Sequence, residues 1–349
     1  MNIRRLRPIT ALVGAAALGL TTLTACSSNS GDGRTDGKLD VVASFYPLQF
    51  LAQRIGGDAI HVSSLTKPGV EPHDLEISPR QTADLSEAGL VVYLKGLQPS
   101  VDRAIGQAEP RHVADAAAYT TLEDHGTDVE GDHDHGGEGD HGGEGDHGAE
   151  GDHGGEGDHG GEGEEGHEGH AHSGDAAADP HIWLDPVRYA QVAKGVGKAL
   201  EKADPDHATT YKKNTTALVK ELTTLDQDFR SGLKDRSSDT FITTHAAFGY
   251  LAERYGLRQE AISGLDPESE PSPARIKGLH SVAKKEKVNT VFFETLVSDR
   301  TAKTLAGDLH LRTDVLDPIE GIGDKSKGDD YIQVMRSNLK ALQKALGTK

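Results

Sequence analysis

The chain has 349 residues, enough for two domains of modest size, and a formal net charge of −19. The acidity is local, because residues 123–175 hold 19 of the 56 acidic side chains and no Lys or Arg, which leaves 37 acidic against 37 basic side chains elsewhere. This balance argues against a nucleic-acid partner, and a single cysteine excludes an intrachain disulfide.

Residues 1–25 are typical of an export signal. Three arginines fall within the first seven residues and are followed by an apolar run at 9–23, which is too short to span a membrane comfortably. The run ends in LTAC, which resembles a bacterial lipobox, so we expect lipid at Cys26 to anchor the exported protein to the outer face of the cytoplasmic membrane. The alternative is a signal cut elsewhere with an incidental cysteine. Residues 26–38 are polar and predict a flexible tether.

From Leu39 onward, short apolar runs alternate with helical stretches. Such alternation predicts parallel strands covered by helices on both faces. We expect strands at residues 39–44, 60–65, 90–94, 111–114, 240–244, 258–263, 290–294 and 313–316. We expect helices at residues 47–55, 78–87, 186–234 with a break at Asp204 and Pro205, 248–255, 273–286, 299–309 and 329–346.

Residues 205–234 carry one continuous apolar stripe with spacings of seven, three and four. Its members are Tyr211, Leu218, Leu222, Leu225, Phe229 and Leu233. A helix of this length would reach about 45 Å, so we expect it to link two lobes. The predicted fold is α/β: an N-terminal lobe at 39–203, the linker helix, and a C-terminal lobe at 235–349, each lobe with a parallel sheet flanked by helices.

Residues 123–175 form an insertion within the first lobe. A hexamer of the type GDHGGE occurs four times between residues 139 and 162, and Val129 is the only large apolar residue between His125 and His172. Such a composition predicts disorder, and repeated imidazoles predict weak metal sites that collect or buffer zinc. A solvated acidic linker is the alternative. The ten histidines are His125, His133, His135, His141, His147, His153, His159, His167, His170 and His172.

Four other side chains are candidates for one ordered metal site. His73 lies in a Pro- and Gly-rich loop after a predicted strand, His245 and Asp317 each follow a strand directly, and His181 comes shortly after the insertion. Ligands of open parallel sheets gather at the carboxyl ends of strands, and three imidazoles with one carboxylate suit zinc. Taken singly, each histidine could instead be a core or capping residue, and Asp317 could be a turn carboxylate before Pro318.

Six motifs follow one another along the chain: PGVEPHDLEISP, ADPHIWLDP, THAAFGYLAERYGL, GLDPESEPSPARI, VFFETLVSDRTAKTLA and VLDPIEG. They resemble the motifs of the zinc-binding solute receptors of bacterial ABC importers, a group that also contains manganese receptors. The resemblance covers the chain from Leu39. It implies two lobes joined by a rigid helix and a metal ion in the cleft between them, with His73, His181, His245 and Asp317 as ligands and Glu294 close behind them.

The resemblance implies a binding protein rather than an enzyme: a monomeric receptor that captures Zn²⁺ and delivers it to an ABC permease. Manganese receptors tend to have a carboxylate where this chain has His245, and imidazole favours zinc. A receptor for manganese or another divalent metal is one alternative. A zinc hydrolase with Glu294 as general base is another. The third is a metal-storing or adhesive surface protein that acts through its histidine repeat.

Overall fold

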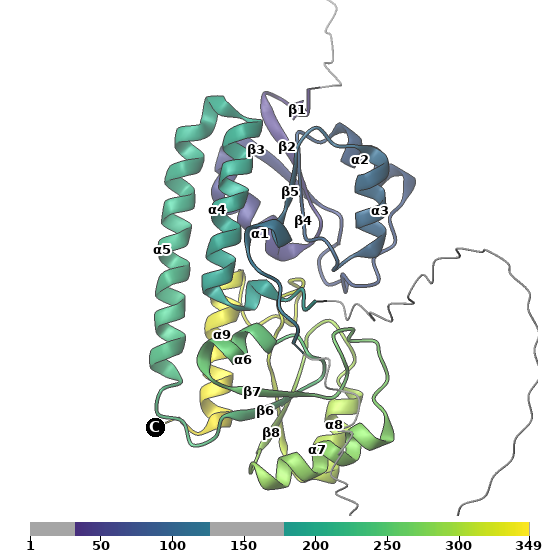
Figure 1. The fold of residues 1–349 in the computed structure, drawn as a ribbon, viewed down its shortest axis with the longest axis vertical. Helices are drawn as coiled ribbons and strands as arrows, with labels where there is room; N and C mark the ends of the chain where they lie inside the picture. Colours follow the sequence, from purple (N-terminus) through teal and green to yellow (C-terminus); the bar gives the residue numbers. More distant parts are fainter. Residues whose placement is uncertain (1–31, 126–177, 349) are drawn as a thin grey trace, which may run out of the picture.

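The computed structural model describes residues 32–125 and 178–348. The predicted export signal, Cys26, the tether up to residue 31 and the insertion histidines other than His125 lie outside these residues. The described part forms two lobes, one above the other, with a long helix beside both (Figure 1). Among the helices of this described part, none has the length and apolar composition that crossing a membrane requires.

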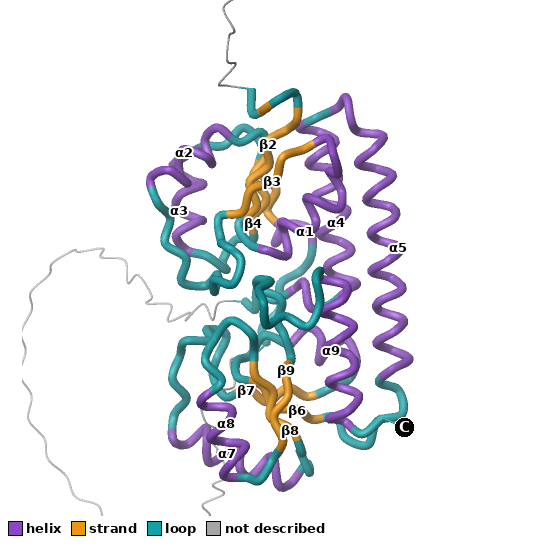
Figure 2. The backbone as a smooth tube through the Cα atoms, turned by 180° about the vertical axis from the view of Figure 1, so that it is seen from behind, coloured by secondary structure: helices purple, strands orange, loops and turns teal. Residues whose placement is uncertain are grey.

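The first lobe contains a sheet of strand order β3-β2-β4-β5. Its strands are β2 (Lys38–Ala43), β3 (Ile60–Ser64), β4 (Leu90–Tyr93) and β5 (Val113–Asp115), all paired in parallel. Helix α1 (Tyr46–Gly56) covers one face, and α2 (Pro79–Glu87) and α3 (Pro99–Ala108) cover the other (Figure 2). Helix α3 was not predicted, because its three buried apolar residues are too few to establish a helical period in the sequence.

The predicted tether ends earlier than expected. Strand β1 (Arg34–Thr35) pairs antiparallel with the start of β2 through a turn in which Asp36 and Gly37 have φ values of 51° and 77°. The guanidinium of Arg34 also lies 2.6 Å from the buried carboxylate of Asp204, between the two long helices. Ordered structure therefore begins before Leu39, within the range assigned to the tether.

The second lobe contains a parallel sheet of strand order β7-β6-β8-β9. Its strands are β6 (Thr240–Thr243), β7 (Arg258–Ala261), β8 (Thr290–Phe293) and β9 (Arg312–Val315). Helices α7 (Pro273–Lys285) and α8 (Arg300–Asp308) pack on one face, and α6 (Gly249–Tyr255) and α9 (Tyr331–Leu346) pack on the other. Two parallel sheets flanked by helices confirm the predicted fold class.

Two long helices connect the lobes. Helix α4 (Pro186–Ala203) ends at Asp204, and α5 (Ala208–Gly232) then runs beside α1 and α4 in the first lobe and beside α9 in the second (Figure 1). At 1.5 Å per residue, its 25 residues span about 37 Å. Asp204 accepts hydrogen bonds from Tyr211 (2.5 Å) and Arg34 and lies 2.7 Å from His207 Nδ1, so the predicted break is a well-bonded corner.

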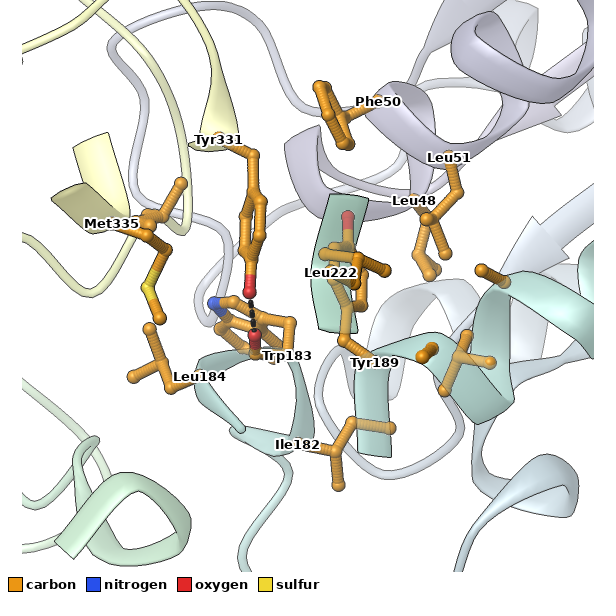
Figure 3. Packing of buried hydrophobic residues seen from close by; sticks show 14 of the residues in the cluster. Leu48, Phe50, Leu51, Ile182, Trp183, Leu184, Tyr189, Leu222, Tyr331 and Met335 are labelled. Atoms are coloured by element: carbon orange, nitrogen blue, oxygen red, sulfur yellow. Dashed lines mark hydrogen bonds between the residues drawn. The ribbon is translucent and has the colours of Figure 1, made fainter. Parts of the chain in front are cut away.

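One hydrophobic core continues across both lobes. Close to its centre, Phe50 of α1, Trp183, Tyr189 of α4 and Tyr331 of α9 pack together (Figure 3). Tyr331 donates a hydrogen bond of 2.6 Å to the carbonyl of Trp183, and both side chains are buried. A wide hinge motion between the lobes would expose this apolar surface to water and is therefore costly.

Replacement of Leu222 by alanine is expected to lower the free energy of unfolding by about 2–5 kcal/mol. Leu222 lies on α5 and is fully buried against the shared core, so truncation leaves a cavity there. Denaturant unfolding of the metal-free protein measures the change. Thr223→Ala, at the exposed neighbouring position, is the matched control and should shift stability by less than about 0.5 kcal/mol. Equal stabilities for the two variants would show that α5 is not packed as described.

Candidate metal centre

Three imidazoles and one carboxylate meet between the two lobes. They belong to His73, His181, His245 and Glu320, and their potential ligand atoms all lie within 4.8 Å of one another. His181, His245 and Glu320 are buried, whereas the side chain of His73 retains 12% of its exposure. His73 and His181 come from the first lobe and the other two from the second, so both lobes direct metal-binding groups at this common point.

The spacing of the four donors fits a tetrahedral ion. Glu320 Oε1 lies 3.1 Å from His181 Nε2 and 3.3 Å from the Nε2 atoms of His73 and His245, and the Nε2 atoms of His181 and His245 are 3.4 Å apart. Tetrahedral zinc with bonds of about 2.0–2.1 Å requires donors separated by about 3.3 Å. Four of the six donor–donor distances, which form the edges of the tetrahedron, therefore have the required length.

Loops at the carboxyl ends of strands carry these groups. His73 lies in the loop between β3 and α2, and Gln98 anchors this loop by donating to the carbonyl of Pro72 (3.1 Å) and to Thr66. His245 comes two residues after β6, and His181 stands directly before the short 3₁₀ turn Ile182–Leu184. The edge of the sheet thus positions the site, as expected for parallel strands.

Two of the imidazoles are each oriented by a buried carboxylate of their own. Asp179 Oδ1 lies 2.7 Å from His181 Nδ1, and Glu294 Oε1 lies 2.6 Å from His245 Nδ1 and also accepts a hydrogen bond from Thr244. With Nδ1–H donating to a carboxylate, each ring turns its Nε2 lone pair towards the centre, the arrangement usual for metal-bound histidine. Glu294 thus lies beside one of the grouped imidazoles. Asp179 was not predicted in this role.

The charges of the site hold protons on the imidazoles and keep Glu320 ionised. Burial opposes protonation of His181 and His245, but Asp179, Glu294 and Glu320 outweigh it and raise the pKa of both rings. Burial would raise the pKa of Glu320, yet the surrounding imidazoles lower it well below the usual value. A divalent cation would replace those protons as the partner of the carboxylates.

A further acidic side chain, Glu71, lies at the edge of the group. Its Oε2 accepts a hydrogen bond of 2.9 Å from the backbone of His73, and its Oε1 lies 4.0 Å from His73 Nε2. Burial, together with the negative charge of Glu320, raises the pKa of Glu71 to about 8. Glu71 therefore fixes the loop of His73 and adds negative charge close to the centre when it is ionised.

The structure corrects the sequence prediction at the fourth donor position, which Glu320 occupies in place of Asp317. The carboxylate of Asp317 is used in its own turn, where it accepts hydrogen bonds from the backbone of Ile319 (2.8 Å) and from Thr295 (3.1 Å). Burial raises its pKa to about 6. Asp317 thus has the turn role that the sequence left open as its alternative.

The turn that Asp317 stabilises delivers Glu320. Ile319 has a φ of 59°, a left-handed conformation that is strained for a β-branched residue. Asn338 of α9 donates to the carbonyl of Asp317 and accepts from its N–H, and Trp183 donates to the carbonyl of Pro318. These bonds hold the backbone in the conformation that directs Glu320 inwards. The only sequence signal for Glu320 was its place as the second carboxylate in VLDPIEG.

The two lobes share a core and enclose one group of four possible metal ligands between them. The chain belongs to the family described as zinc-uptake complex component A, periplasmic (ZnuA), whose model matches residues 41–345.

Similar proteins carry names that refer to zinc. The chain is 35% identical over 333 residues to the zinc-binding lipoprotein AdcA of Streptococcus pneumoniae, covering 94% of this chain and 59% of AdcA. It is 34% identical over 334 residues to the high-affinity zinc uptake system protein ZnuA of Bacillus subtilis, covering 93% and 94%. The crystal structure of Zn(II)-bound AdcA matches with a TM-score of 0.67 at 30% identity, covering 90% of this chain and 59% of AdcA. The chain thus spans somewhat more than half the length of AdcA.

Proposed function

We propose that this protein is an extracytoplasmic receptor that captures Zn²⁺ with high affinity and delivers it to an ABC permease for uptake. The tetrahedral set of His73, His181, His245 and Glu320 carries the proposal, because its donor spacing fits zinc and both lobes contribute to it. The names of the ZnuA and AdcA relatives point to the same cargo.

The donor set favours zinc over manganese. Three imidazoles and one carboxylate oxygen in a compact, buried group suit zinc, whereas manganese is better served by carboxylates, carbonyls and water in octahedral geometry. A manganese receptor of the same family would need further oxygen donors. Glu71 is the nearest additional carboxylate, and one of its oxygens is engaged by the backbone of His73.

Hydrolysis fits the geometry less well than binding. A catalytic zinc needs a coordination position for water and a base beside it, but four protein donors complete a tetrahedron here. The base suggested by the sequence, Glu294, has one oxygen engaged by both Thr244 and the Nδ1 side of His245. These contacts assign Glu294 to orienting the imidazole.

The remaining features complete the proposal. Lipid at Cys26 holds the receptor at the outer face of the cytoplasmic membrane, residues 26–31 act as its tether, and the receptor is a monomer. The insertion histidines gather or buffer ions near the binding centre. The lobes at 39–203 and 235–349, joined by the helix at 205–234, move little relative to each other because they share one core. Release to the permease then proceeds through a local shift of the loop that carries His73, the one partly exposed donor.

Deletion of residues 126–177 is expected to leave one tight zinc site per chain. Asp179 donates its N–H to the carbonyl of Glu123 at 2.9 Å, so the ends of the deleted segment lie together and a short Gly-Ser link can join them. Metal analysis and calorimetric titration of the mature protein, with and without the segment, measure stoichiometry and affinity. The weak sites of the nine histidines after His125 should appear only in the full chain. A shortened chain without a tight site, or with tighter binding of manganese than of zinc, would contradict the proposed function.

A further inference from the structure

A second group of metal-binding side chains lies where the insertion leaves the first lobe. Glu123 and His125 stand at the end of the described range 32–125, and Glu253 comes from α6 of the second lobe. Their ligand atoms lie within 4.8 Å of one another, with His125 Nε2 3.2 Å from Glu253 Oε2 and 3.8 Å from Glu123 Oε2. The shorter separation matches the donor spacing of about 3.3 Å for tetrahedral zinc.

One buried carboxylate serves this group and the centre between the lobes. Asp179 Oδ2 lies 3.2 Å from His125 Nδ1, while Asp179 Oδ1 lies 2.7 Å from His181 Nδ1. The side chain of Asp179 is fully buried. His125 is therefore oriented as His181 is, with a carboxylate at Nδ1 and Nε2 left facing acidic oxygens, which is how proteins prepare an imidazole for a metal ion.

The ring of His125 is packed against neighbouring residues on one side and adjoins a pocket on the other. The ring meets Tyr250 edge to face, with ring centroids 4.4 Å apart. A side chain at Gly249 would clash with His125, because its Cβ would lie 2.3 Å from the Cβ of His125. A pocket of about 420 Å³ adjoins it, lined among others by Asp124, His125 and Glu253. The side chain of Glu253 is 57% exposed, so an ion can enter from outside.

The charge of the group favours a cation but limits its affinity. Arg188 pairs closely with Glu123 Oε1 and lies 4.0 Å from Glu253 Oε2, and its guanidinium stacks over Tyr250. The three carboxylates of Glu123, Glu253 and Asp179 therefore surround His125, with only one permanent positive charge paired with them among the described residues, that of Arg188. An incoming ion must share Glu123 with Arg188, so binding here should be weaker than at the centre between the lobes.

We propose that Glu123, His125 and Glu253 bind a second divalent cation of the zinc class at the base of the histidine-rich insertion. The proposal does not require zinc at the other centre. Asp179 lies between this group and His181, with its two oxygens 3.2 Å from His125 Nδ1 and 2.7 Å from His181 Nδ1. An ion held here would occupy an intermediate position between the insertion and the tight site.

Zinc titration of a full-length chain with the nine histidines after His125 replaced by serine tests the proposal. We expect two ions per chain, the second bound at least about a hundredfold more weakly than the first. In that background His125→Gln should remove the second ion and keep the first, and Glu253→Gln should weaken the second by about tenfold or more. Glu87→Gln, at an exposed position on α2, is the matched control and should change neither.

The outcomes separate this proposal from the proposed function. A single zinc ion in the nine-serine chain, or a second ion that survives His125→Gln, would overturn the second site and leave the first intact. Absence of a tightly bound zinc ion in the unmodified chain would instead contradict the proposed receptor function. Retention of the tight ion also shows that each variant has folded. Anomalous diffraction from crystals of the nine-serine chain grown with excess Zn²⁺ should place a peak within bonding distance of His125 Nε2.

Discussion

Replacement of Glu320 by glutamine is expected to weaken zinc binding by more than about a hundredfold, whereas Asp317→Asn should leave the affinity within about threefold of the unmodified protein. Glu320 Oε1 lies 3.1–3.3 Å from three imidazole nitrogens, so its negative charge would be in direct contact with the bound ion. The carboxylate of Asp317 bonds to the backbone of Ile319 in its own turn and to the side chain of Thr295, and an asparagine can preserve these two bonds. Competition titration against a chelator of known affinity measures both variants.

His245→Ala extends the comparison, because it removes a donor and leaves Glu294 without its imidazole partner. We expect a loss of about a thousandfold or more, equivalent to about 4 kcal/mol. Glu294→Gln, which only alters the orientation of His245, should cost about 10–100-fold. An Asp317→Asn variant that loses zinc as severely as Glu320→Gln would restore the original assignment. Equal affinity in His245→Ala and the unmodified protein would refute the site as a whole.

The strands and the meeting of two of the four grouped side chains, His73 and His245, could be predicted from the sequence on physical grounds. Strands of a parallel sheet end at a common edge, so His245 and the loop of His73 had to lie near that edge once the apolar runs before them were identified. Strand boundaries accordingly agree with the structure to within about two residues, and helices with a long apolar stripe, such as α5, were located correctly.

The fourth donor could not be predicted because its position depends on a local backbone conformation. Asp317 comes two residues after β9 and is therefore the natural candidate, but a left-handed Ile319 reverses the chain and turns Glu320 inwards instead. That conformation depends on Asn338 and Trp183, which are distant in sequence. The double role of Asp179, whose oxygens face the Nδ1 atoms of His125 and His181, likewise depends on contacts that no spacing in the sequence reveals.

The stabilisation that zinc gives to the fold is expected to increase as the pH rises from about 6.5 to 8. In the metal-free protein the pKa values of His181 and His245 are raised by their carboxylate partners, so the folded state binds more protons than the unfolded chain, whose histidines titrate near 6.5. The stability from these protons is fully present below about pH 6.5 and is lost as the pH rises through the folded-state pKa values. Glu71, with a pKa of about 8, acts in the same direction.

Zinc reverses this dependence, because it binds neutral imidazoles and must displace their protons. Each displaced proton adds about 1.4 kcal/mol of zinc stabilisation per pH unit. Thermal unfolding of metal-free and zinc-loaded protein at a fixed free zinc concentration should therefore show a Tm difference that widens by at least about 5 °C between pH 6.5 and 8. In His245→Ala the difference should be smaller and less dependent on pH. A Tm difference that stays constant or narrows over this range would mean that zinc does not displace protons from these imidazoles, and hence that it binds elsewhere.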